Sequence, residues 1–156
     1  MTLDFDDGNG PVSAHCHPNG GGWVADTAYV SDTATIGPDA RVRGNALVCG
    51  NARVRDWALV GGNAVVGGNA VVGGNAVVGG NAVVGGNALV CDKALVYDKA
   101  RVRGNAVVYG SAVVGGSAVV RDKSCVCGNA VVGGNALVRN WALVGGSAVV
   151  RDLPRD

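Results

Sequence analysis

Apolar residues recur with a fixed period of six along most of this chain. From residue 27 to residue 152 the sequence divides into 21 units of six residues, with no insertion or deletion between them. The second position of each unit is alanine, except at Ser124, and the fourth is valine, except at Ile36. A period of six does not fit the 3.6 residues of a helical turn, and the glycines in most units also disfavour helix. The pattern therefore excludes a helical repeat.

Each unit instead predicts a short strand followed by a corner. In a triplet such as Ala76-Val77-Val78, the first and third side chains point to one side and the second points to the other. The Gly-Gly-Asn that often follows is typical of turns, because Gly and Asn tolerate the left-handed backbone region that a sharp corner needs. Strands and corners in alternation form a coil.

We expect three units to close one triangular coil of 18 residues, so the chain has about seven coils stacked roughly 4.8 Å apart. The predicted fold class is all-β, a parallel β-helix in the form of a triangular solenoid, with alanine and valine filling its interior. The predicted boundaries are residues 1–26 as an N-terminal cap or tail, 27–152 as the repeat domain and 153–156 as a C-terminal tail. Residues 22–24, Gly-Trp-Val, offer an alternative start as part of an extra unit.

The composition fits thin stacked layers better than a globule with a large Leu and Phe core. The 156 residues include 27 glycines and only 4% aromatic residues, and the formal net charge is +1. With so little net charge, we expect no nucleic-acid partner and no attraction to an anionic membrane surface. The longest uncharged stretch, 58–90, is interrupted by turn residues every six positions, so it does not predict a membrane-spanning helix.

The cysteines do not form a disulfide pattern. They are odd in number and irregularly spaced, at Cys16, Cys49, Cys91, Cys125 and Cys127. Reduced thiols are expected, and without an apolar signal segment near the N-terminus the default location is cytoplasmic; a longer secreted parent protein would change that. Neither the pair Cys125 and Cys127 nor the segment 15–17, His-Cys-His, supplies four ligands, so we predict no metal site and no cofactor.

The outward third position of the units forms columns, because residues 18 apart lie above one another in such a coil. This position is apolar in 17 of the 21 units. One column is uninterrupted after Arg41 and is the candidate self-association face: Leu59, Val77, Leu95, Val113, Val131 and Val149. An exposed apolar patch of this extent indicates an interaction surface. The alternative interpretation is that β-branched residues simply suit strands.

Basic residues gather at one corner. Arg103, Arg121 and Arg139 form a column, with Lys123 and Trp141 two residues further along their units, and these five residues are the candidate anion strip. Like charges roughly 4.8 Å apart repel unless an anion or a carboxylate lies near them. Trp141 would offer a stacking surface to such an anion. A solvated edge, neutralised by Asp122 and counterions, is the alternative.

Asparagines form columns at the other corners. Asn51, Asn69, Asn87 and Asn105 share one column, and Asn45, Asn63 and Asn81 share another. Stacked asparagine side chains can hydrogen-bond along the axis of a coil. We expect them to reinforce the rod rather than to bind a ligand.

The units resemble the hexapeptide repeat of left-handed β-helix proteins. In that repeat an aliphatic residue is followed by a small or acidic residue, two variable residues, a small residue and a variable one, and Val66-Gly67-Gly68-Asn69-Ala70-Val71 matches it in full. More narrowly, units such as 44–48, Gly-Asn-Ala-Leu-Val, look like the uncharacterised bacterial Gly-Asn-Ala-x-Val β-solenoid repeats. The resemblance covers residues 27–152 and implies a left-handed coil. It is specific for fold and not for function.

Many hexapeptide-repeat proteins are acyltransferases, and the resemblance implies a histidine general base and loops that hold an acyl donor. The only histidines here, His15 and His17, precede the first complete unit, and no unit carries an insertion. We therefore predict a non-catalytic structural or scaffold protein that forms a homo-oligomer through its apolar face and has no small-molecule substrate. The alternatives are a binding module for an anion or for a surface such as a polysaccharide or ice, and an acyltransferase-like protein.

Overall fold

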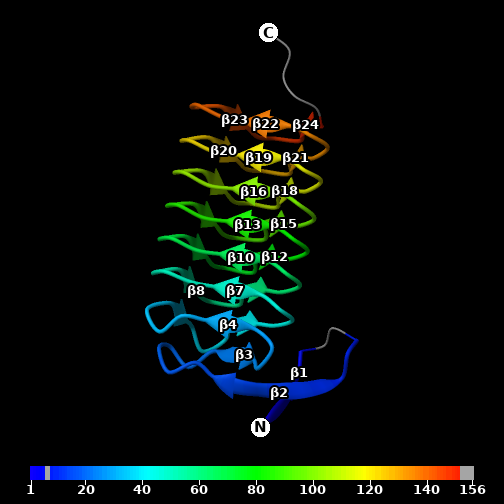
Figure 1. Cartoon of the computed structure of the whole chain (residues 1–156). Helices are drawn as coiled ribbons and strands as arrows, with labels where there is room; N and C mark the ends of the chain where they lie inside the picture. The colour runs from blue at the N-terminus through cyan, green and yellow to red at the C-terminus, as the bar shows by residue number, and fades with distance from the viewer. Residues whose placement is uncertain (6–7, 152–156) are drawn as a thin grey trace.

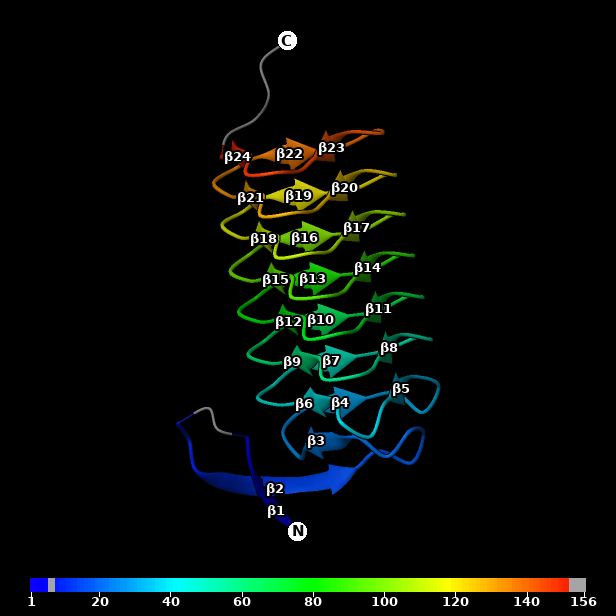
Figure 2. The same cartoon turned by 180° about the vertical axis from the view of Figure 1, so that it is seen from behind.

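The computed structural model describes residues 1–5 and 8–151, and this part of the chain is all-β. Its strands stack into a three-sided parallel β-solenoid of about seven coils, with the N-terminus at one end and the last coils at the other (Figure 1). The view from behind shows the same ladder of coils (Figure 2). No helix in the described residues is long and apolar enough to cross a membrane. The predicted fold class is confirmed, and the tail expected at 153–156 lies outside the described residues.

Three sheets form the sides of the solenoid, and every repeat strand is two residues long because a corner follows it. The first sheet contains β1 (Thr2–Asp4), β2 (Pro11–Cys16), β3 (Trp23–Ala25), β6 (Arg41–Val42), β9 (Leu59–Val60), β12 (Val77–Val78), β15 (Leu95–Val96), β18 (Val113–Val114), β21 (Val131–Val132) and β24 (Val149–Val150). The second sheet contains β4 (Tyr29–Val30), β7 (Leu47–Val48), β10 (Val65–Val66), β13 (Val83–Val84), β16 (Arg101–Val102), β19 (Val119–Val120) and β22 (Leu137–Val138). The third sheet contains β5 (Thr35–Ile36), β8 (Arg53–Val54), β11 (Val71–Val72), β14 (Leu89–Val90), β17 (Val107–Val108), β20 (Cys125–Val126) and β23 (Leu143–Val144).

Successive coils are in register with a shift of 18 residues. Val77 pairs in parallel with Leu59 in the coil before it and with Leu95 in the coil after it. The hydrogen bonds that flank the strands run from an N–H of one coil to a C=O of the next, as from Leu59 N to Ala76 O over 3.0 Å. The expected 18-residue coil is therefore confirmed.

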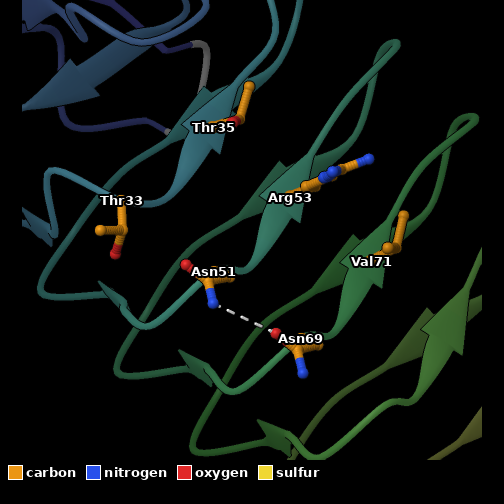
Figure 3. Close-up of a pocket in the computed structure, with 6 residues that line it drawn as sticks. All are labelled: Thr33, Thr35, Asn51, Arg53, Asn69 and Val71. Atoms are coloured by element: carbon orange, nitrogen blue, oxygen red, sulfur yellow. Dashed lines mark hydrogen bonds between the residues drawn. The ribbon is translucent and has the colours of Figure 1, made fainter.

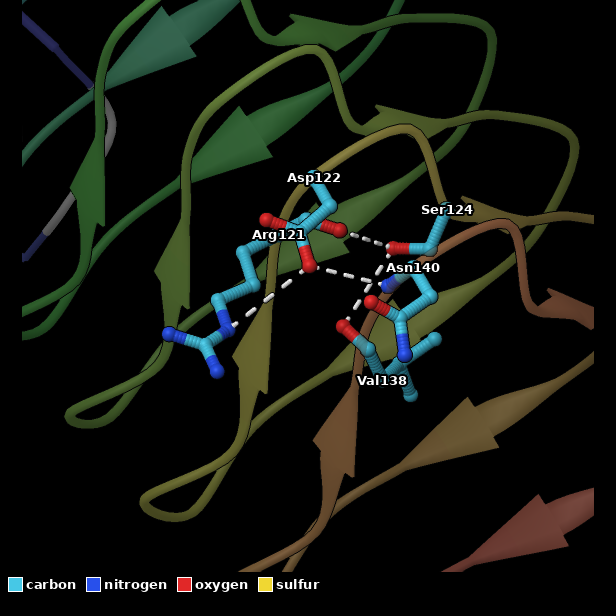
Figure 4. A network of polar contacts seen from close by, with 5 residues as sticks. All are labelled: Arg121, Asp122, Ser124, Val138 and Asn140. Carbon is cyan, nitrogen blue, oxygen red and sulfur yellow. Dashed lines mark hydrogen bonds and ion pairs between the residues drawn. The ribbon is translucent and has the colours of Figure 1, made fainter.

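The alanines and valines of the second and fourth positions fill the interior. Through most of the stack these side chains are no more than 3% exposed, and they form one continuous cluster. Ser124, the one break in the alanine column, is also buried: its hydroxyl donates to Arg121 O over 2.6 Å and lies 3.3 Å from Val138 O (Figure 4). The interior tolerates Ser124 because its hydroxyl group is hydrogen-bonded to a backbone carbonyl.

The last position of each unit turns the corner, and in most units it lies in the left-handed backbone region. Glycine usually holds it, as at Gly86, where φ is 63°. The other residues with positive φ are Asp56, Asp92, Asp98, Asp122 and Asn140. All four aspartates accept a hydrogen bond from the N–H 18 residues further on, over 2.9–3.3 Å. The Gly-Gly-Asn segments do form the predicted corners, and within each of them the second glycine, not the asparagine, has the positive φ.

The N-terminal segment covers one end of the coils. Strand β2 pairs antiparallel with β1 and β3, whereas β3 pairs parallel with β6 in the 18-residue register, so the stack already begins at β3. The carbonyl of Ala34, which has no repeat strand beneath it, lies 3.0 Å from His17 Nε2 and accepts a hydrogen bond from Asn19 Nδ2 over 3.2 Å. These two side chains thus substitute for a missing coil.

Candidate functional site

The six residues of the candidate self-association face lie in one outward column of the first sheet. The five from Leu59 to Val131 are half-buried, and Val149, in the last described coil, is 55% exposed. Strand register sets their side chains side by side, since each residue of the column pairs with the next. We call this column the apolar face.

A column of glycines lies beside the apolar face. It occupies the fifth position of the same units, at Gly61, Gly79, Gly115 and Gly133. Tyr97 interrupts the column, Arg151 ends it, and the Arg43 side chain of the preceding coil lies over Gly61. A Cβ added at Gly79 or Gly133 would meet no atom within 4 Å, so the surface there is open. A Cβ at Gly115 would come within 2.7 Å of the Tyr97 ring, which therefore lies along the sheet rather than away from it. The glycines keep this side of the solenoid flat.

Charge distinguishes the other two sheets from the first. From Leu59 to Gly133, the first sheet has no charged residue at the third or fifth position of its units, whereas Arg43 and Arg151 hold the fifth position in the units before and after this stretch. The second sheet carries arginines at these positions, at Arg101, Arg103, Arg121 and Arg139, and the third carries Arg53 and Arg55. The first sheet is therefore uncharged at these positions only in its middle coils, and arginines lie near both of its ends.

The arginines of the candidate anion strip follow strands of the second sheet. Arg103 and Arg139 are exposed, and Arg121 is half-buried. Arg121 Nε lies 4.0 Å from Asp122 Oδ2, which also accepts a hydrogen bond from Asn140 N over 2.9 Å (Figure 4). The same Nε is buried and has no hydrogen-bond partner among the described residues. The Asp122 carboxylate therefore lies near two donors, Asn140 N and Arg121 Nε, and it accepts a hydrogen bond only from Asn140 N.

The other two members of the strip contact each other. Lys123 Nζ lies 4.5 Å from the centroid of the Trp141 ring, which is an attractive cation–π geometry. A hollow of about 410 Å³ lies at this corner, and it is lined by Gly104, Asn105, Asp122, Lys123, Asn140 and Trp141. Trp141 is 76% exposed, so the surface expected to stack on an anion is shared with an ammonium group of the chain itself.

A polar groove of about 520 Å³ lies along the third sheet. It is lined by Thr33, Thr35, Asn51, Arg53, Asn69 and Val71 (Figure 3). Asn51 Nδ2 donates to Asn69 Oδ1 over 3.4 Å, and Asn69 Nδ2 donates to Asn87 Oδ1 over 3.3 Å. The predicted asparagine ladder is confirmed for these three residues. Because their amides bond to one another, they reinforce the rod along its axis.

The histidines contact other parts of the cap. His15 Nδ1 lies 2.6 Å from Asp26 Oδ1, and His17 is buried beside Ala34. Within residues 1–5 and 8–151, no three side chains of His, Cys, Asp or Glu come together as a metal ion would require. All five cysteines are free thiols. The cap therefore uses both histidines in holding its own strands and the first coil.

Two features of these surfaces were not predicted from the sequence. The glycine column beside the apolar face was visible as a repeated fifth position, but its flatness depends on the observed backbone. Arg101 lies two residues before Arg103 and extends the candidate anion strip onto the second sheet. Tyr109 lies one coil before Cys127 in the same column, as the 18-residue period predicts. No protein-family model, no curated protein and no solved structure matches this chain.

Proposed function

We propose that this chain is a non-catalytic structural protein, a rigid rod that pairs with a second copy through the apolar face of its first sheet. The observation that carries the proposal is an unbroken aliphatic column beside a column of mostly glycine, with no charged residue in either from Leu59 to Gly133 and with Arg43 and Arg151 at the two ends. A contiguous exposed apolar surface on a soluble chain is typical of an interaction site.

A second copy fits this face because its column repeats with the same spacing. Five intervals between coils span about 24 Å, and with a width of about 20 Å each copy contributes about 480 Å². A pair then buries roughly 960 Å², which is below the roughly 1,200 Å² of standard stable interfaces and corresponds to a weak, reversible dimer. Trp57, which is 67% exposed at the corner before Leu59, and Tyr97 add aromatic surface of the kind that interfaces favour. We therefore expect an isologous dimer.

Replacing Val77, Val113 and Val131 together by Lys is expected to convert the dimer into a monomer. Each copy would bring three ammonium groups into an apolar interface with no carboxylate to pair them. The fold should persist, because these side chains point outward and the core beneath them is unchanged. Sedimentation velocity at several concentrations measures the association, and far-UV circular dichroism measures the fold.

The matched control places three lysines at the same strand position of the second sheet, at Val65, Val83 and Val119. This variant should remain dimeric, because the second sheet takes no part in the pairing. An unmodified chain that sediments as a monomer at every concentration would refute the proposal. Equal dissociation of both triple variants would also refute it, since the effect would then come from charge alone.

The positions of the histidines support a non-catalytic role. The described coils carry no projecting loop that could hold an acyl donor, and every unit keeps its six residues. His15 and His17 bond to Asp26 and Ala34 within the cap and the first coil. Turnover of acetyl-CoA that is lost on replacing either histidine would contradict this part of the proposal.

The second sheet favours a second candidate function, which is the binding of a polyanion such as a sulfated polysaccharide. Its arginines outnumber the nearby carboxylates, and within the described residues no carboxylate pairs with Arg103 or Arg139. Such a cluster attracts extended anions through its summed field.

Replacing Arg103 and Arg139 together by Ala should lower the salt concentration at which the chain elutes from immobilised heparin. The matched control is the pair Arg53→Ala and Arg55→Ala on the third sheet, which removes the same charge. If both pairs shift the elution equally, retention follows net charge and the anion strip has no special role.

A further inference from the structure

Two thiols and a phenol come together on the third sheet, away from the apolar face. Cys125 is the first residue of β20 (Cys125–Val126), and Cys127 follows the strand directly with its N–H still bonded to the next coil, so the two side chains point to the same outward side. Tyr109 belongs to the preceding coil and lies in the same column as Cys127. All three side chains are at least partly exposed. They form a compact sulfur-rich patch on an otherwise aliphatic and glycine-rich surface.

The Tyr109 hydroxyl interacts with both thiols. Interaction with Cys127 first, and then with Cys125, raises the pKa of Tyr109 to about 12. Burial raises the pKa of the Cys125 thiol, with a smaller contribution from the neighbouring Cys127 sulfur. The strand register independently places Tyr109 one coil before Cys127, since Val107 pairs with Cys125. Cys127 also faces an open side, because Gly145 in the next coil has no side chain.

The backbone of this strand prevents the two thiols from forming a disulfide with each other. Cys125 N donates to Ala142 O, and Cys127 N donates to Val144 O, each over 2.9 Å, so both ends of the segment are held extended. Residues two apart on a strand place their Cβ atoms about 6.6 Å apart, whereas a disulfide needs about 3.5–4.5 Å. A cation can bridge the wider gap, because two metal–sulfur bonds of about 2.3 Å each span up to roughly 4.6 Å between the sulfurs.

We propose that Cys125 and Cys127 form a binding site for one soft, thiophilic cation of low coordination number, of the Cu(I) class. Thiolate ligands select such cations over harder ones, and two ligands on one rigid strand suit a cation that accepts two-coordinate geometry. Each thiol loses its proton to solvent as its sulfur binds, and no change of oxidation state is involved. The remaining thiols stand alone: Cys49 and Cys91 each occupy the fifth position of a unit with no second cysteine on their strand.

The test is an anaerobic titration of the full chain with Cu(I), held in solution by a coloured chelator that competes for it. The unmodified chain should withdraw one equivalent of Cu(I) from the chelator. Cys125→Ser and Cys127→Ser should each bind at least about 100-fold more weakly, because the second sulfur of a chelating pair acts at an effective concentration in the millimolar range. Cys49→Ser and Cys91→Ser are the matched controls and should bind like the unmodified chain.

A second readout needs no substitution. With one equivalent of Cu(I) bound, iodoacetamide should alkylate Cys16, Cys49 and Cys91 and spare Cys125 and Cys127, as peptide mass spectrometry would show. Equal protection of all five thiols would overturn the proposal. Unchanged affinity in both the Cys125→Ser and Cys127→Ser variants, with their circular dichroism intact, would also overturn it.

Discussion

The substitution Val78→Asp is expected to unfold the chain, whereas Val77→Asp, one residue earlier, should leave it folded. Val78 is fully buried in the column of valines, and no donor is near enough in that column to pair a carboxylate. Burial of an unpaired charge costs more than about 4 kcal/mol, which is a large share of the stability of an ordinary domain. Loss of the β-rich circular dichroism spectrum of Val78→Asp at 25 °C would give the result directly.

Val77→Asp is the matched control, because it introduces the same side chain into the same strand. Val77 is only half-buried and points outward, so its carboxylate stays in water and the urea midpoint should change little. Pairing through the apolar face should weaken in this variant. Equal unfolding by the two substitutions would contradict the assignment of inward and outward positions.

The second large effect is expected at the corners, where Gly86→Val should destabilise the solenoid by at least about 2 kcal/mol. The backbone of Gly86 has a φ of 63°, which a β-branched residue adopts only at a cost of about 1–3 kcal/mol. An added Cβ would also lie 2.8 Å from Gly104 N in the next coil, so the two coils would have to separate. The free energy of unfolding in urea, followed by circular dichroism, measures the loss.

Two further substitutions separate backbone strain from the mere addition of a side chain. Gly85→Ala should be nearly neutral, because Gly85 has no positive φ and a Cβ there would meet no atom within 4 Å. Gly86→Asp should cost much less than Gly86→Val. At Asp92, which has the same place in its unit, the carboxylate accepts a hydrogen bond from Gly110 N over 3.1 Å. If Val and Asp at residue 86 cost the same, the corner aspartates are not compensating for their backbone conformation.

The repeat itself was sufficient to predict the coil and its interior. Side chains alternate along a strand, so once Ala76 and Val78 are assigned inward, Val77 must point outward. A constant unit of six then fixes which residues lie above one another, and Val77 indeed pairs with Leu59 and Leu95. The hydrogen-bonded ladder of Asn51, Asn69 and Asn87 was predicted from the same 18-residue spacing.

Other features depend on backbone dihedral angles and side-chain directions, which the six-residue period does not specify. The pattern Gly-Gly-Asn holds three turn-forming residues, and only the observed φ values show that the second glycine makes the corner. Side chains at the fifth position lean toward the next coil, as Cys49 does over Gly67 and Tyr97 over Gly115. This lean brings Tyr109 toward Cys127, and no feature of the sequence indicates its direction. The contacts of the N-terminal cap could not be predicted either, because His17 and Asn19 are not part of the repeat.

The central claim is that two copies lie side by side through the apolar face. Small-angle X-ray scattering of the unmodified chain over a range of concentrations measures both the mass and the longest dimension of the particle. We expect a particle of twice the 15.5 kDa of one chain, with a wider cross-section and a length close to that of a single rod. A particle of one chain's mass at every concentration would contradict it, as would a particle of doubled mass and doubled length, which would place the contact at the ends of the rod.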